Sequence, residues 1–375
     1  MQDMKVISLF SGAMGLDLGL IKAGLDIVVG QDFDANCVET MKANGHKALG
    51  GSISDLPSSA LLEIAGMVQG EPFMVCGGPP CQPFSTAGKR LGINDPRGSL
   101  FMDFIRVIND VKPRFFVFEN VKGLLSAKLL DANGKETSDL VLDVILDEFS
   151  KLNYKLAFDV LDAVNYGVPE FRERFIMIGS RDHEDVFLPL PTHFQKHQDP
   201  AYRWRTLGDA IEDLEDDCGE CAVFSEERAR LLEMVPEGGN WRSLPQDIAR
   251  KAMGGAYLSG GGKVGYFRRL TYAQPSPTLV TSPVQKQTMM CHPTRTRPLS
   301  VKEYARIQQF PDNWKFMGTL ASRYRQIGNA VPVGLGCAIG KAVIACADGN
   351  AEIQTKRRRG TSMHAHAFEP QFAAS

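Results

Sequence analysis

The sequence predicts an α/β protein that combines a mostly parallel β-sheet with a smaller, loop-rich second domain. Through the first half of the chain, short apolar runs alternate with helical patterns. The apolar runs are nearly continuous, as in strands that are buried on both faces. After about residue 181 this alternation gives way to prolines, acids and glycines.

The expected strands cover residues 6–10, 27–31, 73–76, 115–118, 156–161 and 175–178. Residues 34–44 and 139–152, which lie between strands, have helical patterns. The second of these helices has an apolar stripe at Val141, Ile145 and Phe149, and Ser138 is its expected N-cap. Two later helices are expected at 300–309 and 333–347.

The change in composition predicts the domain boundaries. Residues 1–184 form the expected first domain, which about 298–348 complete, and residues 185–297 form the second. Residues 351–375 are polar and include the basic run from Lys356 to Arg359, which indicates a disordered tail.

The formal net charge is −2 over 375 residues, which counts mildly against a nucleic-acid-binding protein. However, acids crowd residues 209–220 and arginines flank them, so a basic groove can coexist with an acidic back face. No apolar run reaches the ~18 residues of a membrane span. The first residues lack the basic start of a signal peptide. The 8 scattered cysteines are typical of reduced thiols, so we expect a cytoplasmic protein with no membrane partner.

A glycine-bearing turn follows the first expected strand, and an acid ends the second. The turn, FSGAMG at 10–15, lets the backbone approach a nucleotide-like ligand, although glycines also close ordinary strand–helix turns. Asp32 lies where an acid can accept hydrogen bonds from both ribose hydroxyls. Together the two features favour an adenosine-containing cofactor.

A cysteine, Cys81, lies directly after a buried strand in GGPPCQPFS (77–85), at the sheet edge where α/β proteins place their sites. A thiol in such a stiff turn is a nucleophile when its neighbours lower its pKa. The alternative is a buried structural cysteine. Prolines on both sides are unusual for a core position, so we favour the functional interpretation.

Three charged residues lie near other strand ends. Glu119, in FENV (118–121), either donates a proton from a partly desolvated carboxyl or caps the next helix. Arg172 and Arg174 alternate in an extended segment and share one face, so a single ligand can meet both. Surface charge pairing is the alternative for the two arginines.

These motifs, in this order, resemble those of the cytosine-C5 DNA methyltransferase family of restriction–modification systems. The cofactor loop is similar to FSGAMG, the nucleophile loop to GGPPCQPFS, the acid motif to FENV, and the arginine motif to VPEFRER. Two late motifs are similar to RRLTYAQPSPTL (268–279) and QIGNAVPVGLG (326–336). The resemblance implies a Rossmann-like S-adenosylmethionine-dependent methyltransferase domain and a target-recognition domain at 185–297.

The resemblance implies catalytic roles for Cys81, Glu119, Arg172 and Arg174. Cys81 would attack C6 of a cytosine that has been flipped out of the duplex. Glu119 would hold or protonate N3 of the ring, and Arg174, with Arg172 beside it, would bind the base. C5 would then take the methyl group from S-adenosylmethionine.

The residues implied for the cofactor are Phe10, Gly12, Gly15, Asp32, Phe33, Ser52, Ile53, Pro80, Leu100, Asn329 and Val331. Some positions depart from the family pattern. Met14 stands where glycine is usual, and Asp32 replaces the commoner glutamate. Ser52 stands where an aspartate usually receives the adenine amino group, which would lower cofactor affinity. Glu170 replaces a usual glutamine.

The implied partner is double-stranded DNA. Residues 85–100 are similar to the family's mobile catalytic loop, in which Ser85, Lys89, Arg90 and Arg97 would meet DNA. In the second domain we expect DNA contacts from Arg268 and Arg269; further candidates are Arg203, Trp204, Arg205 and Tyr257. Cys218 and Cys221 form a CxxC pair, but no second pair follows, so no metal is expected.

Several alternatives remain open. The same chemistry could act on transfer RNA, although that branch usually has a Cys-Phe-Thr element that is missing here. A catalytically silent homologue would not need Cys81, Glu119 and Arg174. A nicotinamide-dependent oxidoreductase fits the glycine spacing poorly. The expected enzyme is a monomer, and a cognate restriction endonuclease is its expected functional partner.

Overall fold

The computed structural model describes residues 4–80, 99–130, 135–214, 218–258, 263–350 and 366–368. These residues form two compact units. Unit 1 comprises Met1–Asp162, Glu173–Pro191 and Leu335–Ser375, and unit 2 comprises Ala163–Arg172 and Thr192–Gly334.

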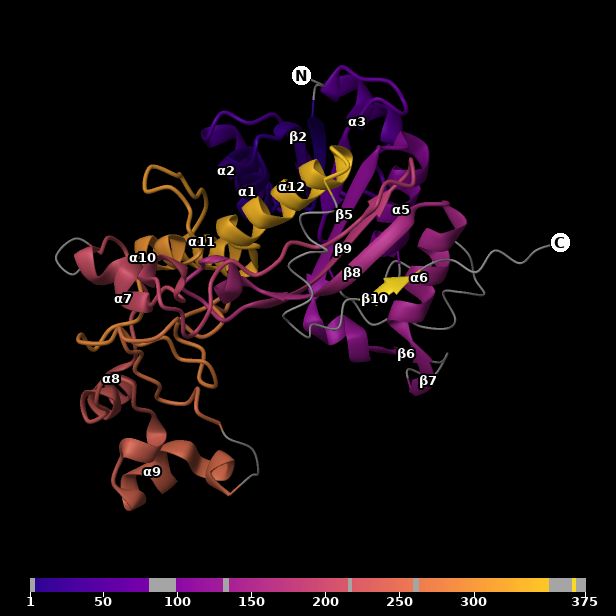
Figure 1. Ribbon diagram of the computed structural model, residues 1–375. Coiled ribbons are helices and arrows are strands. Elements are labelled where there is room, and N and C mark those ends of the chain that lie inside the picture. Colours follow the sequence, from indigo (N-terminus) through magenta and orange to yellow (C-terminus); the bar gives the residue numbers. More distant parts are fainter. Residues whose placement is uncertain are drawn as a thin grey trace. The chain divides into compact units, whose positions relative to one another are not determined.

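Unit 1 is built on one eight-stranded sheet with the strand order β10-β8-β9-β5-β4-β1-β2-β3 (Figure 1). Strands β1 to β5 pair in parallel, whereas β9 pairs antiparallel with both β5 and β8. The mostly parallel sheet is therefore confirmed. The strands are β1 (Lys5–Leu9), β2 (Asp26–Asp32), β3 (Ala48–Gly50), β4 (Met74–Gly77), β5 (Phe115–Val121), β8 (Lys155–Asp162), β9 (Glu173–Ser180) and β10 (His366–Phe368).

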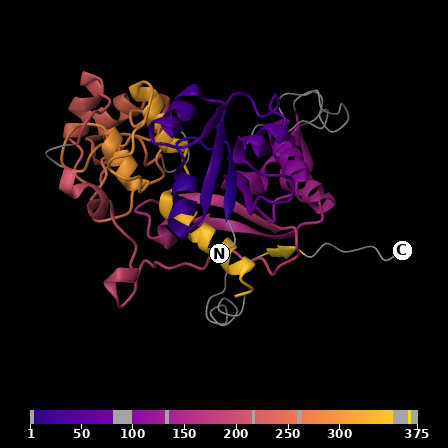
Figure 2. The ribbon, with the colours of Figure 1, turned by 90° about the horizontal axis from the view of Figure 1, so that it is seen from above.

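Helices cover both faces of this sheet, as Figure 2 shows from above. Side chains from α3, α5 and α6 share one core cluster with alternate residues of β1, β4 and β5. On the other face α12 packs against α1, so closely that a Cβ at Gly340 would lie 2.7 Å from that of Ala23. The helices are α1 (Gly15–Ala23), α2 (Ala35–Ala43), α3 (Ser58–Ala65), α5 (Ser99–Val111), α6 (Val141–Lys151) and α12 (Val333–Ala347).

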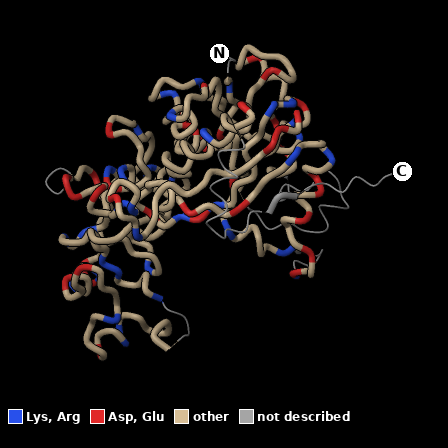
Figure 3. Tube along the Cα trace, in the orientation of Figure 1, with Lys and Arg blue, Asp and Glu red and all other residues tan. Residues whose placement is uncertain are grey.

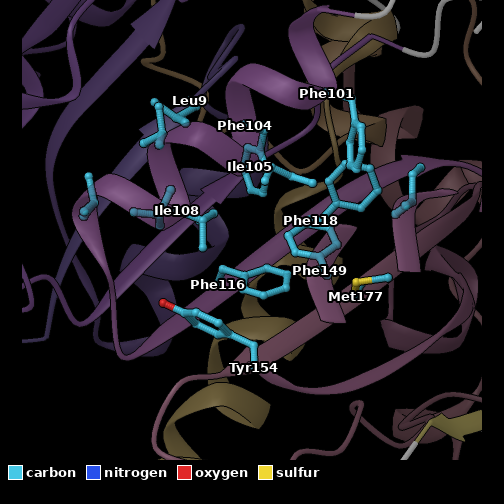
Figure 4. Packing of buried hydrophobic residues seen from close by; sticks show 14 of the residues in the cluster. Leu9, Phe101, Phe104, Ile105, Ile108, Phe116, Phe118, Phe149, Tyr154 and Met177 are labelled. Atoms are coloured by element: carbon cyan, nitrogen blue, oxygen red, sulfur yellow. The ribbon is translucent and has the colours of Figure 1, made fainter. Parts of the chain in front are cut away.

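Aromatic rings fill the centre of the cluster under α5 and α6 (Figure 4). Phe116 of β5 stacks on Phe149 of α6 with ring centroids 4.4 Å apart. Phe104 and Phe118 meet Phe149 edge-on, an arrangement that such rings prefer. The packed core holds β4 and β5 side by side, and both strands end at the same edge of the sheet.

The expected helix 139–152 is present, but its start differs from the prediction. The stripe Val141, Ile145 and Phe149 is buried, as expected. Ser138 is not the N-cap, because Glu136–Leu140 forms a strand, β7, that pairs with β6 (Lys128–Leu130). Leu140 occupies the cap position and makes no side-chain capping bond.

Unit 2 has short helices joined by long loops, and its described residues form only isolated β-bridges. Its α-helices are α7 (Leu207–Ile211), α8 (Glu226–Glu233), α9 (Gln246–Met253), α10 (Val301–Ile307) and α11 (Leu320–Asn329). Ser300 caps α10 in a reciprocal capping box with Glu303. A small core cluster lies beneath α8 and α9.

The unit boundaries differ from those expected at 185 and 297. Residues 163–172 and 298–334 belong to unit 2. Arg172 and Glu170 join the first of these segments to Leu279 and Gly328. In the tail predicted to be disordered, the structure describes only β10, which pairs with β8. The rest of that tail lies outside the described residues, so its disorder stays a prediction.

One helical stretch, Leu320–Ala347, is apolar and long enough to cross a membrane by length and composition alone. Within the structure 67% of its most apolar window is buried, which is the pattern of a core helix.

Candidate active site

The carboxyl ends of β1, β2, β4 and β5 lie at one edge of the unit 1 sheet, since these strands are parallel. Four of the sequence motifs lie at the ends of these strands or directly after them. Topology thus brings together segments that are up to about a hundred residues apart in the chain.

The turn after β1 is tied to the end of β2. Gly12 has a φ of 54°, in the left-handed region that favours glycine. Its backbone N–H donates to Asp32 Oδ2 at 2.7 Å, and the N–H of Asp34 donates to Asp32 Oδ1 at 2.8 Å. The glycine turn after β1 and the acid at the end of β2, both predicted to bind the cofactor, are therefore joined by hydrogen bonds.

Asp32 keeps the capacity to bind a ligand. A carboxylate has about four acceptor positions, and two of them are used by the backbone. Burial raises the pKa of Asp32 above its ordinary value, and the backbone hydrogen bonds oppose this rise. The neighbouring ring of Phe33 is 78% exposed, whereas Phe10 is partly buried against the core. An acceptor beside an uncovered ring fits the ribose and adenine of an adenosine-containing cofactor.

Two residues of α5 hold the segment that follows β3 in place. Arg106 donates to the carbonyl oxygens of Ile53 at 2.8 Å and Leu56 at 3.4 Å. Asp103 accepts from both Arg106 Nε and the Ser54 hydroxyl. The side chain of Ile53 is buried in the core, so a cofactor contact there would involve its backbone.

Glu119 and Arg174 meet at the same edge of the sheet. Glu119 Oε1 lies 2.9 Å from Arg174 Nε, and the two side chains are only 13% and 11% exposed. A Cβ at Gly78 would collide with Glu119 Oε2, so the acid lies against the start of the loop that leads to Cys81. The expected grouping of Glu119 with Arg174 is therefore present in the structure.

Sequence reasoning missed Asn120, the second residue of FENV. Its side-chain N–H donates to the carbonyl oxygen of Pro79 at 3.0 Å, and the Asn120 side chain is buried. Asn120 thus fixes the Pro79–Pro80 segment next to Glu119. The available signal was its place in a motif at a strand end.

A fully buried carboxyl lies beneath the β1 turn. Asp17 Oδ1 accepts a long contact from the Cys76 thiol at 3.8 Å, and the Ser8 hydroxyl also bonds to this carboxyl. Asp17 Oδ2 has no partner among the described residues. Burial raises the pKa of Asp17 to about 7.

In unit 2, the contacts of Arg172 are those of a residue that supports the structure. Its guanidinium donates to the carbonyl oxygens of Leu279 at 3.2 Å and Gly328 at 2.7 Å, and it is 1% exposed. Glu170 lies 3.5 Å from it and accepts from the N–H of Leu279 at 2.6 Å. The glutamate at the usual glutamine position thus balances a buried charge. Arg172 and Arg174 belong to different units, and direct substrate contact by Arg172 stays a prediction.

The expected DNA contact at Arg269 does not fit its surroundings. Arg269 is 6% exposed and donates to the carbonyl oxygens of Val235, His292 and Leu232, and to the Thr296 hydroxyl. It is therefore a structural residue rather than a DNA contact. Arg268 also points inward, to the Met289 carbonyl, and burial lowers its pKa to about 10.

Other expected site residues are placed only in part. Pro80 is exposed, Leu100 is partly buried against the core, and Gly15 begins α1. Asn329 and Val331 belong to unit 2. No metal-binding group of three His, Cys, Asp or Glu residues occurs in the part of the chain that the structure describes. Cys81, Ser85, Lys89, Arg90 and Arg97 lie outside the described residues.

Comparisons with known proteins agree with this arrangement. A family model described as C-5 cytosine-specific DNA methylase matches residues 4–345. The chain is 41% identical over 351 residues to type II methyltransferase M.PspPI of Psychrobacter sp., covering 92% of this chain and 79% of that protein. It is 39% identical to type II methyltransferase M.Eco47II of Escherichia coli, covering 90% and 78%.

A likeness to a solved structure supports the fold. A mutant of DNMT2 from Spodoptera frugiperda matches with a TM-score of 0.57 at 20% identity, covering 91% of this chain and 99% of that one. At this level of identity the likeness shows the fold alone.

Proposed function

Because this chain belongs to the C-5 cytosine-specific DNA methylase family, we propose that it methylates C5 of a flipped cytosine in a specific duplex sequence, through a covalent bond between Cys81 and C6. The observation that carries the proposal is the Glu119–Arg174 pair. It lies against Gly78, three residues before Cys81, at the sheet edge that also holds Asp32.

In the proposed reaction Glu119 holds the pyrimidine at N3 and supplies a proton there, while Arg174 orients both the acid and the base. The Cys81 thiolate bonds to C6, and the electron pair of the C5–C6 bond becomes available at C5. Bound S-adenosylmethionine would supply the methyl group. Loss of the C5 proton to a base then expels the Cys81 thiolate and restores the ring.

The residues of unit 1 fit the cofactor. Asp32 has unused acceptor positions for ribose hydroxyls, and Phe33 offers an exposed ring for adenine. Gly12 and Gly15 line the turn, and Ser52, Ile53, Pro80 and Leu100 complete the proposed set, with Asn329 and Val331 from unit 2.

The names of the relatives support a further part of the proposal. Both relatives described above are called type II methyltransferases. We infer that this enzyme acts as a cytoplasmic monomer on double-stranded DNA and protects a sequence that a cognate restriction endonuclease cuts.

The test is methylation of unmodified duplex DNA with labelled S-adenosylmethionine, mapped by bisulfite sequencing, with a matched RNA as second substrate. We expect 5-methylcytosine in one sequence context of the DNA. Label in RNA alone would favour the transfer-RNA alternative, and no label with folded protein would indicate a silent homologue.

Two variants test the assigned roles. Cys81→Ser should abolish turnover and leave S-adenosylmethionine binding intact, whereas Cys218→Ser, a half-buried cysteine of unit 2, should keep full activity. Glu119→Gln should lower kcat by about 10²- to 10³-fold, because general acid catalysis contributes roughly that much. Full turnover by Cys81→Ser would exclude the proposed nucleophile.

A further inference from the structure

Within unit 2, the segment from η6 (Trp241–Ser243) through α9, which Figure 1 labels, to η7 (Gly254–Tyr257) has both buried and exposed residues. Ala249 and Met253 of α9 are buried in the small core. Trp241 and Tyr257 pack against the same core and are only partly covered. The two rings contact each other edge-on, with centroids 5.7 Å apart.

Two exposed arginines lie on these rings. The guanidinium of Arg242 is 5.5 Å from the centroid of Trp241, and that of Arg250 is 5.6 Å from the centroid of Tyr257. A ring that is fixed by a core restricts the rotamers of a guanidinium stacked on it, so less freedom is lost when an anion binds. We call Arg242, Arg250, Lys251, Trp241 and Tyr257 the α9 surface.

The charge of this segment differs from that of its neighbour, α8. Residues 241–258 contain Arg242, Arg250 and Lys251 against the single acid Asp247. On α8 three acids outnumber two arginines, and Arg230 lies 3.5 Å from Glu226. Figure 3 shows blue positions on the α9 segment and red positions gathered on α8. The segment 241–258 thus contains two more cations than anions.

We propose that the α9 surface binds the phosphate backbone of the duplex DNA that carries the target cytosine. The proposal rests on the proposed function for its choice of anion. Guanidinium groups that are held in place on aromatic rings suit bidentate phosphate contacts. The α9 surface also supplies the DNA contact for unit 2 that Arg269, being buried, does not make.

The test measures binding, not catalysis. The dissociation constant of the protein for a labelled 20-base-pair duplex would be measured from 50 to 300 mM salt, for the wild type and for Arg242→Ala/Arg250→Ala. Each lost phosphate contact lowers the slope of log K against log salt by about 0.9. We expect the double variant to lose about two in slope and at least tenfold in affinity at low salt.

Arg230→Ala is the matched control, because Arg230 is exposed, lies in the same unit and is balanced by Glu226. It should change affinity less than twofold. Lys251→Glu, which disturbs no ring contact, should weaken binding as well. An unchanged salt slope in the double variant, or an equal loss in Arg230→Ala, would overturn the proposal. Failure of the proposed function would instead appear as absent DNA methylation by the wild type, whatever the slope.

Discussion

The sheet edge of unit 1 and the loop framework of unit 2 differ in what their buried arginines contact. In unit 1 the strands satisfy one another's backbone groups, and Arg174 pairs with the Glu119 side chain and donates to only one backbone carbonyl, that of Glu173. In unit 2, Arg172 and Arg269 together donate to five backbone carbonyl oxygens. Where few strands or helices are present to pair with backbone carbonyl groups, a buried guanidinium can donate the hydrogen bonds that these carbonyls need.

Unit 2 contains a second buried hydrogen-bond network of charged and polar side chains. His292 Nδ1 accepts from the N–H of Arg295 at 3.2 Å, so the ring proton belongs on Nε2, which faces Glu303 at 3.4 Å. Glu303 also receives two hydrogen bonds from Arg297. Charged side chains in this unit therefore hold the chain together, and charge alone does not identify a ligand-binding residue.

The largest effect on stability is expected from Arg269→Met. It leaves three buried carbonyl oxygens without their donor, and we expect it to destabilise unit 2 by about 3–5 kcal/mol. Urea unfolding followed by tryptophan fluorescence reports this unit, because Trp204, Trp241 and Trp314 all lie in it.

The control for this variant is Arg230→Met on exposed α8, which should change stability by less than about 0.5 kcal/mol. Equal losses in the two variants would mean that Arg269 does not hold the loops.

A smaller effect is expected from Asp17→Asn in unit 1. Burial raises the pKa of Asp17 from 3.8 to about 7, so the folded protein binds a proton that the unfolded chain has released. The stability of the wild type therefore falls as pH rises from about 4 to about 7, and the loss persists above that range. Asparagine cannot ionise, so the variant should gain about 2–4 kcal/mol relative to the wild type between pH 4 and pH 8.

Urea unfolding followed by far-ultraviolet circular dichroism at both pH values measures this gain. Parallel pH profiles of wild type and variant would show that the buried carboxyl does not titrate as described.

The smallest effect concerns the support of the predicted adenine-binding segment. Arg106→Lys removes the guanidinium whose Nη2 donates to the Ile53 and Leu56 carbonyls, and it should weaken S-adenosylmethionine binding about tenfold, or about 1.4 kcal/mol. Isothermal titration calorimetry measures the dissociation constant of S-adenosylmethionine directly. Arg181→Lys, which alters carbonyl contacts at the opposite edge of the sheet, should leave it unchanged. A loss common to both variants would contradict a local role for Arg106.

The sequence was sufficient for unit 1 because its strands are continuous apolar runs and its motifs follow strand ends. Asp32 and Glu119 could be placed by that rule, whereas Arg174 lies at the start of β9 and was assigned from the family resemblance. Sequence reasoning failed at Ser138, where pairing of β7 with the preceding strand β6 overrode a good capping residue.

In unit 2 the same reasoning misplaced Arg269, because burial there depends on loops whose paths no periodicity encodes. The α9 surface escaped notice for a related reason. Ring and guanidinium contacts between Trp241, Arg242, Arg250 and Tyr257 depend on how η6, α9 and η7 fold together.

We propose that the Cys81 thiol attacks the target base, which the Glu119–Arg174 pair binds. This proposal is tested most directly with a duplex that contains the preferred sequence with 5-fluorocytosine at the target position, incubated with enzyme and S-adenosylmethionine. The fluorine cannot leave as a proton does, so the account predicts a stable protein–DNA adduct whose peptide mass places the bond on Cys81. Efficient methylation of the normal duplex without any adduct on the fluorinated one, or an adduct on another residue, would contradict it.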